Sequence, residues 1–171
     1  MNGTLDIFHT LSEVSVAITG FSSLIIIFRG SATPWSSHDY IHFGFVLAWS
    51  IGCIFLSLLP VLLAEFGIAL HQSSRIGFIT AIFYISILGG LLSRAQNAAS
   101  RREGVSPPLR PRIVMTILVF SILAISLLSA VGFMPGPLQA WYALVIVSLL
   151  FVATADLGIF VVHSTRSADT D

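Results

Sequence analysis

The sequence predicts an all-α integral membrane protein, a single domain over residues 1–171 built as a bundle of five transmembrane helices. Hydrophobic residues make up 56% of the chain and charged residues only 9%, whereas soluble domains carry about 25% charged residues. The apolar residues gather into five stretches, each near the ~20 residues that a helix needs to cross hydrocarbon. The arginines are distributed unevenly among the loops, which predicts an orientation for these spans.

The five apolar stretches are bounded by Gly, Pro, Ser and charged residues. Transmembrane β-strands would be about half as long and would alternate apolar with polar residues. These stretches do neither, so helices are expected. The predicted spans cover about residues 7–28, 42–65, 76–93, 113–133 and 138–163.

The connections between these stretches carry helix-breaking residues. Residues 30–34 read Gly-Ser-Ala-Thr-Pro and end the first stretch, whereas residues 135–137 read Pro-Gly-Pro and form a short turn. The last two helices are therefore expected to be antiparallel neighbours. Between the third and fourth spans, the Ala- and Arg-rich segment 94–102 is expected to extend the third helix into water until Gly104 and Pro107-Pro108 stop it.

Arginine supplies every basic residue of the chain, and five of the eight lie in segment 94–112. Short cytoplasmic loops are enriched in Lys and Arg. Five spans place this segment on the same side as Arg29 and Arg166 and leave Arg75 opposite. The N-terminus is therefore expected outside and the C-terminus inside, in a bacterial inner membrane or another membrane that faces the cytoplasm.

The basic cytoplasmic loop 94–112 lacks the interleaved aromatic residues of a nucleic-acid surface, so no nucleic-acid partner is expected. Anionic lipid headgroups explain its charge more simply. The arginines expected to contact them are Arg94, Arg101, Arg102, Arg110 and Arg112.

Glu13 is the charged residue whose position bears most directly on function. Counting ~20 residues back from Arg29 reaches His9, so Glu13 is expected below the outer membrane surface, where an ionisable group is costly unless it is neutralised, paired or hydrated. One hypothesis is a proton- or cation-binding carboxylate on a continuous polar face of the first helix. The alternative is a structural glutamate, protonated or paired with Arg75. The residues predicted to line an ion or proton pathway are Glu13, Asp156, His9, Ser12, Thr19 and Ser23.

Asp156 is a second carboxylate inside a predicted span. It lies ~22 Å along the fifth helix from Trp141 at 1.5 Å per residue, in the inner part of the bilayer. It is expected either to bind a proton or ion or to be a capped or arginine-paired carboxylate near the cytoplasmic interface.

Small residues predict where helices approach closely. Gly44, Ala48 and Gly52 form a ridge on the second helix, and Gly20 lies on the first. Such ridges serve either helix packing within one subunit or an oligomer interface, and the sequence leaves both open.

Residues for cofactor chemistry are sparse, and no cofactor is expected. Cys53 is the single cysteine, so an intrachain disulfide is impossible. His38, Asp39 and His42 could hold a transition metal, and His42 with His163 could ligate haem, but no haem motif supports the second site. Nucleotide-binding, zinc-protease and serine-hydrolase motifs are absent from the sequence.

The sequence favours a small homo-oligomeric membrane channel or transporter-like protein for protons or cations, with a polar intramembrane face on the first helix. Five short helices leave one subunit little room for both a pathway and a lipid-facing wall, so several copies are expected. The alternative is a non-transporting membrane scaffold or accessory subunit of a larger complex. A membrane enzyme or haem carrier is a third interpretation, which no motif supports.

Overall fold

The computed structural model describes residues 2–30, 37–103 and 109–168, with side chains described at 5–25, 40–41, 43–98, 101 and 113–158. Across these ranges the chain is helical and contains no strand, which confirms the predicted all-α fold. The five helices are α1 (Asn2–Gly30), α2 (Ser37–Glu65), α3 (Leu70–Glu103), α4 (Leu109–Val131) and α5 (Leu138–Ala168).

Four helices contain a segment that is long and apolar enough to cross a membrane. Within the described part of α1, residues 5–25, no segment meets the same measure, because Asp6, Glu13 and a series of Ser and Thr residues lower its hydropathy. The four apolar segments are Phe43–Glu65, Leu70–Ala98, Ile113–Val131 and Leu138–Gly158.

All five helices extend beyond the apolar stretches that predicted them, and α3 and α4 do so at the basic segment that joins them. α3 has 34 residues, or ~51 Å at 1.5 Å per residue, and its Ala- and Arg-rich continuation is helical as expected, up to Glu103. α4 begins at Leu109 rather than at residue 113, with Pro111 in its first turn. Proline is tolerated there because the first turn needs no intrahelical N–H bond.

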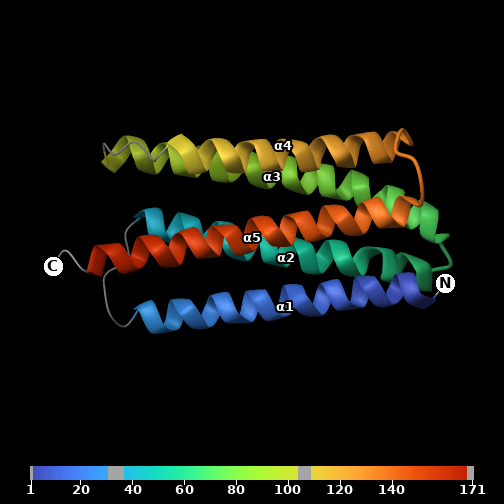
Figure 1. The fold of residues 1–171 in the computed structure, drawn as a ribbon, viewed down its shortest axis with the longest axis horizontal. Helices are drawn as coiled ribbons and strands as arrows, with labels where there is room; N and C mark the ends of the chain where they lie inside the picture. Colours follow the sequence, from blue (N-terminus) through green and yellow to red (C-terminus); the bar gives the residue numbers. More distant parts are fainter. Residues whose placement is uncertain (1, 31–36, 104–108, 169–171) are drawn as a thin grey trace.

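The helices run up and down along one common axis (Figure 1). α2 and α5 lie side by side in the middle, α1 covers one side of them, and α3 and α4 cover the other. The α2–α3 and α4–α5 connections lie at the same end as the start of α1. The ends of α1, α3 and α5 lie at the opposite end.

Each of the two described connections has a glycine within two residues of the end of the preceding helix. Gly67 and Gly132 have φ values of 79° and 87°, a left-handed conformation that glycine adopts without steric penalty. After α2, the Ile68 N–H donates to Leu63 O at 3.0 Å and the Gly67 N–H donates to Ala64 O at 2.9 Å. This is the Schellman pattern, which satisfies the last carbonyls of a helix.

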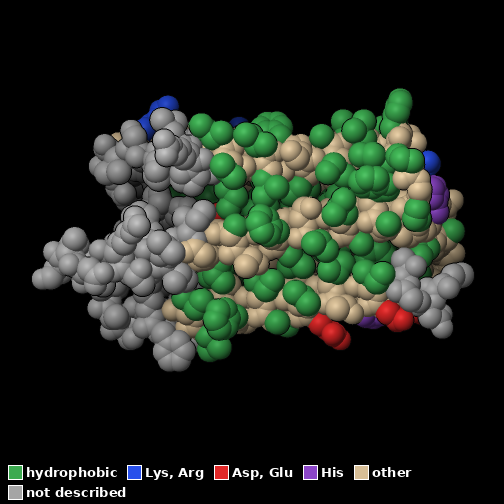
Figure 2. Space-filling view, in the orientation of Figure 1, with side chains coloured by type: hydrophobic (Ala, Val, Ile, Leu, Met, Phe, Trp, Pro, Cys, Tyr) green, Lys and Arg blue, Asp and Glu red, His purple; other side chains and the backbone are tan. Residues whose placement is uncertain are grey.

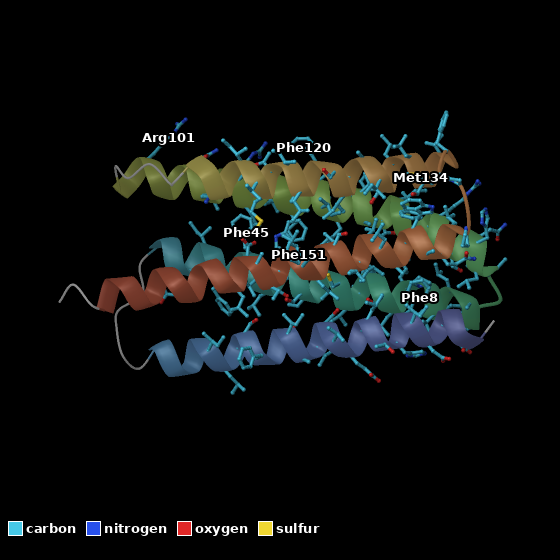
Figure 3. All side chains as sticks on the ribbon, viewed as in Figure 1. Phe8, Phe45, Arg101, Phe120, Met134 and Phe151 are labelled. Atoms are coloured by element: carbon cyan, nitrogen blue, oxygen red, sulfur yellow. The ribbon has the colours of Figure 1, made fainter. Side chains whose placement is uncertain are left out.

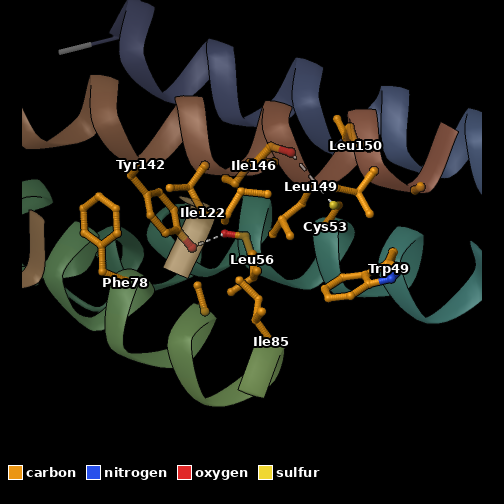
Figure 4. Packing of buried hydrophobic residues seen from close by; sticks show 14 of the residues in the cluster. Trp49, Cys53, Leu56, Phe78, Ile85, Ile122, Tyr142, Ile146, Leu149 and Leu150 are labelled. Carbon is orange, nitrogen blue, oxygen red and sulfur yellow. Dashed lines mark hydrogen bonds between the residues drawn. The ribbon is translucent and has the colours of Figure 1, made fainter. Parts of the chain in front are cut away.

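The core lies where α2, α3 and α5 meet, and Tyr142 of α5 is its largest fully buried side chain (Figure 4). The ring lies over Gly77 of α3, where an added Cβ would stand only 2.5 Å from Tyr142 Cζ. It also makes edge contacts with Phe78, at 5.2 Å between ring centroids, and with Phe8 of α1, at 5.7 Å. Tyr142 therefore joins α5 to both outer layers.

The Tyr142 hydroxyl donates a 2.8 Å hydrogen bond to Leu56 O of α2. In a regular helix the N–H of residue 60 would bond to this carbonyl, but Pro60 has no N–H. A carbonyl without a donor is costly away from water. The tyrosine of α5 thus supplies the donor that the proline of α2 lacks.

Candidate functional site

The inward face of α1 packs on the bundle through Phe8 and a row of serines. Ser12, Ser15 and Ser22 are buried, and small side chains of this kind allow close helix approach in membranes. The Ser15 and Ser22 hydroxyls donate to Leu11 O and Ile18 O in the preceding turn, both at 2.7 Å. Their polarity is therefore satisfied within α1 itself.

The outward face of α1 carries ionisable and small residues. Glu13 is exposed there, and a helical repeat of ~100° per residue places it almost opposite the buried Ser15 and Ser22. The exposed residues around it include Asp6, His9, Ala17 and Gly20, together with the apolar Val16 and Leu24. In Figure 2 the acidic side chains stand at the edge formed by α1, on a surface that is otherwise largely apolar.

The continuous polar face expected on α1 is therefore two faces. Glu13 and His9 point outward, whereas Ser12 is buried against the bundle. Thr19 and Ser23 are half-buried at the boundary, and their hydroxyls donate to Ser15 O at 2.8 Å and Thr19 O at 2.9 Å. Serine and threonine can bond to their own helix and pack inward, so the pathway residues lie on different sides of α1, and their shared role in one pathway with Glu13 stays a prediction.

Glu13 lies level with the middle of the neighbouring spans. The Phe8–Tyr142 ring contact sets the register between α1 and α5, which run in the same direction (Figure 1). Glu13 is five residues past Phe8, so it lies ~7.5 Å deeper at 1.5 Å per residue. The corresponding residue of α5 is Val147, which lies in the middle part of the apolar stretch that begins at Leu138.

No ion pair involving Glu13 is found among the described side chains, which include Arg75. Arg75 instead lies near the start of α3, where its Nη2 atom is 3.5 Å from the position of a Cβ added to Gly132. The alternative that paired Glu13 with Arg75 in one chain is therefore not observed.

Asp156 lies on the inward face of α5. It is 9% exposed and continues the buried series of that helix, in which Ile146, Leu149 and Ala153 recur every three to four residues. Asp156 is 14 residues past Tyr142, or ~21 Å along the axis. Glu13 and Asp156 therefore differ by ~13 Å in depth, and Glu13 is exposed whereas Asp156 is buried, so one chain does not bring them together.

The ridge on α2 meets a side chain of the same chain. The Tyr84 ring of α3 occupies the space beside Gly52, where an added Cβ would stand 2.6 Å from the Tyr84 hydroxyl. That hydroxyl donates to Ala48 O. Gly52 and Ala48 therefore pack within the subunit and do not form a free oligomer interface, whereas Gly20 and Gly44 have no atom within 4 Å of an added Cβ.

Of the five arginines expected to contact lipid, Arg94 and Arg101 are described and both are exposed. The side chains of Arg102, Arg110 and Arg112 lie outside the described residues. Figure 3 shows Arg101 pointing away from the bundle near the end of α3.

The possible metal and haem ligands fall largely outside the described side chains. α2 begins at Ser37, so its backbone places positions 38 and 42 one turn apart. The side chains of His38, Asp39, His42 and His163 are not described. Among the side chains that are, no group of three His, Cys, Asp or Glu residues could hold a metal ion.

Comparisons with protein-family models, with curated proteins and with solved structures find no match to this chain. No relative therefore points to a site, and the candidate site rests only on the geometry of this chain, at the outward face of α1. Asp6 belongs to this face and was missed by sequence reasoning. Asp6 and Glu13 are seven residues apart, or about two helical turns, and this spacing alone could have placed Asp6 on the same face as Glu13.

Proposed function

We propose that this chain is a five-span membrane protein whose copies assemble around the outward face of α1 and pass protons or cations along Glu13. The position of Glu13 carries the proposal, because it is exposed at mid-span depth with no described ion-pair partner. A charged side chain at the centre of a bilayer costs about 2.5–3.5 kcal/mol on insertion scales. Water or polar groups between neighbouring copies would remove much of that cost.

The packing of the subunit supports a pathway between copies rather than through one copy. At the depth of Glu13 the interior is filled by Cys53, Ile146 and Leu149, each at most 1% exposed. An ion path through such a core would need a large rearrangement of close-packed side chains. The outward face of α1 needs none.

The charges at the two ends of the bundle support the proposed orientation, with the N-terminus outside and the C-terminus inside. Arg94 and Arg101 lie on the part of α3 that ends beside the end of α5, whereas Arg75 lies near the opposite end. Positive charge favours the cytoplasmic side. In this orientation Glu13 is reached from outside past Asp6 and His9.

Ion flux in liposomes that contain the purified protein tests the proposed function. Glu13→Gln keeps the shape and hydrogen-bonding capacity of the side chain but deletes its charge. We expect proton or cation flux to fall at least tenfold, or to lose its dependence on pH. The matched control is Asp6→Asn, which alters another exposed carboxylate on the same face, ~10 Å nearer the start of α1, and a smaller change is expected for it. Unchanged flux and pH response in Glu13→Gln would refute the proposed role.

The assembly has a separate test in Gly20→Leu. An added Cβ at Gly20 meets nothing within 4 Å in the subunit, so the variant should fold while its bulk separates neighbouring copies. Mass measurement in lipid nanodiscs is expected to show smaller assemblies than for Gly90→Leu, an equally open glycine on α3. A wild-type protein that is monomeric in native-like lipid would contradict the proposed assembly.

A second candidate function is that of an accessory subunit, favoured by the two carboxylates that α1 presents together. Asp6 and Glu13 complement a partner helix that carries basic or hydrogen-bonding side chains. This function predicts no flux from the purified protein. It also predicts that Glu13→Gln weakens association with another membrane protein.

A further inference from the structure

The side of α3 that faces away from the bundle changes from apolar to basic near its C-terminal end. The inward side contains buried Phe78, Ala81 and Ile85. On the opposite side, Phe83 and Ile87 are 64% and 61% exposed. The exposed residues Arg94 and Arg101 follow Ile87 at intervals of seven residues, and this spacing keeps them on nearly the same side of the helix.

The depth of these arginines follows from the contact between α3 and α2. Tyr84 of α3 touches Gly52 and donates to Ala48 O, and the two helices run in opposite directions (Figure 1). Counting from this contact, Arg94 lies about one turn beyond Phe43, where the apolar segment of α2 begins. Arg101 lies ~10 Å further out.

The depth of Arg94 corresponds to the headgroup layer of a bilayer, whereas the backbone of Arg101 lies beyond it. The polar region adds ~5–7 Å to each side of the ~30 Å hydrocarbon core. Arg94 therefore stands just outside the hydrocarbon, and the long side chain of Arg101 can turn back to the same layer. Both guanidinium groups lie on the side of α3 whose apolar residues would contact acyl chains.

We propose that Arg94 and Arg101 form a binding site for anionic phospholipid headgroups, with the acyl chains of the same lipids lying against Phe83 and Ile87. The guanidinium group matches the geometry of a phosphate oxygen pair and can form two hydrogen bonds with it. The apolar side chains in line with the arginines favour a lipid over a free anion, because a free anion would have no use for them. This site does not depend on whether the protein conducts ions.

The test uses the whole 171-residue chain in detergent with equal amounts of phosphatidylglycerol and phosphatidylcholine. Native mass spectrometry then counts the lipid molecules of each kind that stay bound to the protein. Wild-type protein is expected to retain phosphatidylglycerol preferentially. Each basic side chain near an anionic surface raises the affinity for that surface about fivefold. The double variant Arg94→Gln/Arg101→Gln should therefore lower the preference for phosphatidylglycerol over phosphatidylcholine on the order of 20-fold. The matched control is Arg75→Gln, an exposed arginine near the other end of the same helix, and it should leave the preference within about twofold of wild type.

Three results would overturn the proposal. One is an unchanged lipid preference in the double variant, and another is an equal loss in Arg75→Gln, which would indicate a general effect of charge. The third is a result in which inorganic phosphate displaces more phosphatidylglycerol than chloride does at the same ionic strength. That result would indicate that the arginines bind a free anion. If the double variant does not fold, Arg101→Gln alone is measured, with an expected loss of about fivefold.

Discussion

The bond from Tyr142 to Leu56 O yields a quantitative prediction about how α2 tolerates a proline. Tyr142→Phe keeps the ring over Gly77 and removes only the hydroxyl that bonds to the carbonyl at 2.8 Å. The carbonyl then loses its donor, because Pro60 has no N–H to replace it. Leaving a buried acceptor unsatisfied costs about 1–3 kcal/mol, and side-chain hydrogen bonds measured in one membrane protein reach ~1.7 kcal/mol. We expect Tyr142→Phe to lower the free energy of unfolding by about 1.5 kcal/mol.

Tyr84→Phe is the matched control for this prediction. Tyr84 also donates to an α2 carbonyl, that of Ala48, but the residue one turn later is Gly52, which has an N–H. Removal of the Tyr84 hydroxyl therefore leaves the carbonyl with its regular helical donor. The expected loss is about 0.6 kcal/mol, the average for such bonds in a membrane protein.

A double-mutant cycle isolates the effect of the proline. Pro60→Ala restores an N–H at position 60, so Tyr142→Phe should cost about 1 kcal/mol less in that background. The free energies of unfolding are measured by denaturant titration in mixed micelles, followed by tryptophan fluorescence. The reasoning fails if Tyr142→Phe costs no more than Tyr84→Phe, or if its cost is the same with and without Pro60→Ala.

Two further predictions concern packing and topology. Gly77→Ala should destabilise the fold by about 1–3 kcal/mol through overpacking against the tyrosine ring, whereas Gly90→Ala, with no atom within 4 Å of its Cβ, should leave the thermal unfolding temperature equal or higher. In a cysteine-free background, an impermeant thiol reagent applied from outside should label Gln72→Cys but not Ala98→Cys, both of which replace exposed residues. The opposite labelling pattern would reverse the proposed orientation.

The helices were predictable because each apolar stretch has the length of a span, and Gly and Pro residues mark the connections after the first, second and fourth stretches. The continuation of α3 to Glu103 followed from an Ala- and Arg-rich segment that stops before Gly104. The early start of α4 at Leu109 was not anticipated, because the two prolines that precede it and Pro111 were read as parts of a loop. A proline in the sequence is compatible both with the first turn of a helix and with a connecting loop, so Pro111 alone did not distinguish the two.

The directions of the side chains were much less predictable than the helices. Ser12 and Glu13 are adjacent and both polar, yet Ser12 is buried and Glu13 is exposed. Serine is small and can bond to its own helix, so polarity alone does not assign it to a face. Likewise, the sequence marks Gly52 as a close-approach site but does not identify Tyr84, 32 residues later, as the side chain that fills it.

For the membrane protein proposed above, serines that bond within their own helix have a consequence for how the chain would be inserted. Ser15, Ser57 and Ser126 each donate to a carbonyl four residues earlier in the same helix, so these bonds exist before any other helix arrives. A segment leaving the translocon can therefore enter lipid singly with such hydroxyls already satisfied. Tyr84 and Tyr142 bond across helices and can do so only once α2 stands beside α3 and α5. Insertion of single helices would thus be separable from their packing into a bundle, and the hydrogen bonds of the two tyrosine hydroxyls would form only in the packing step.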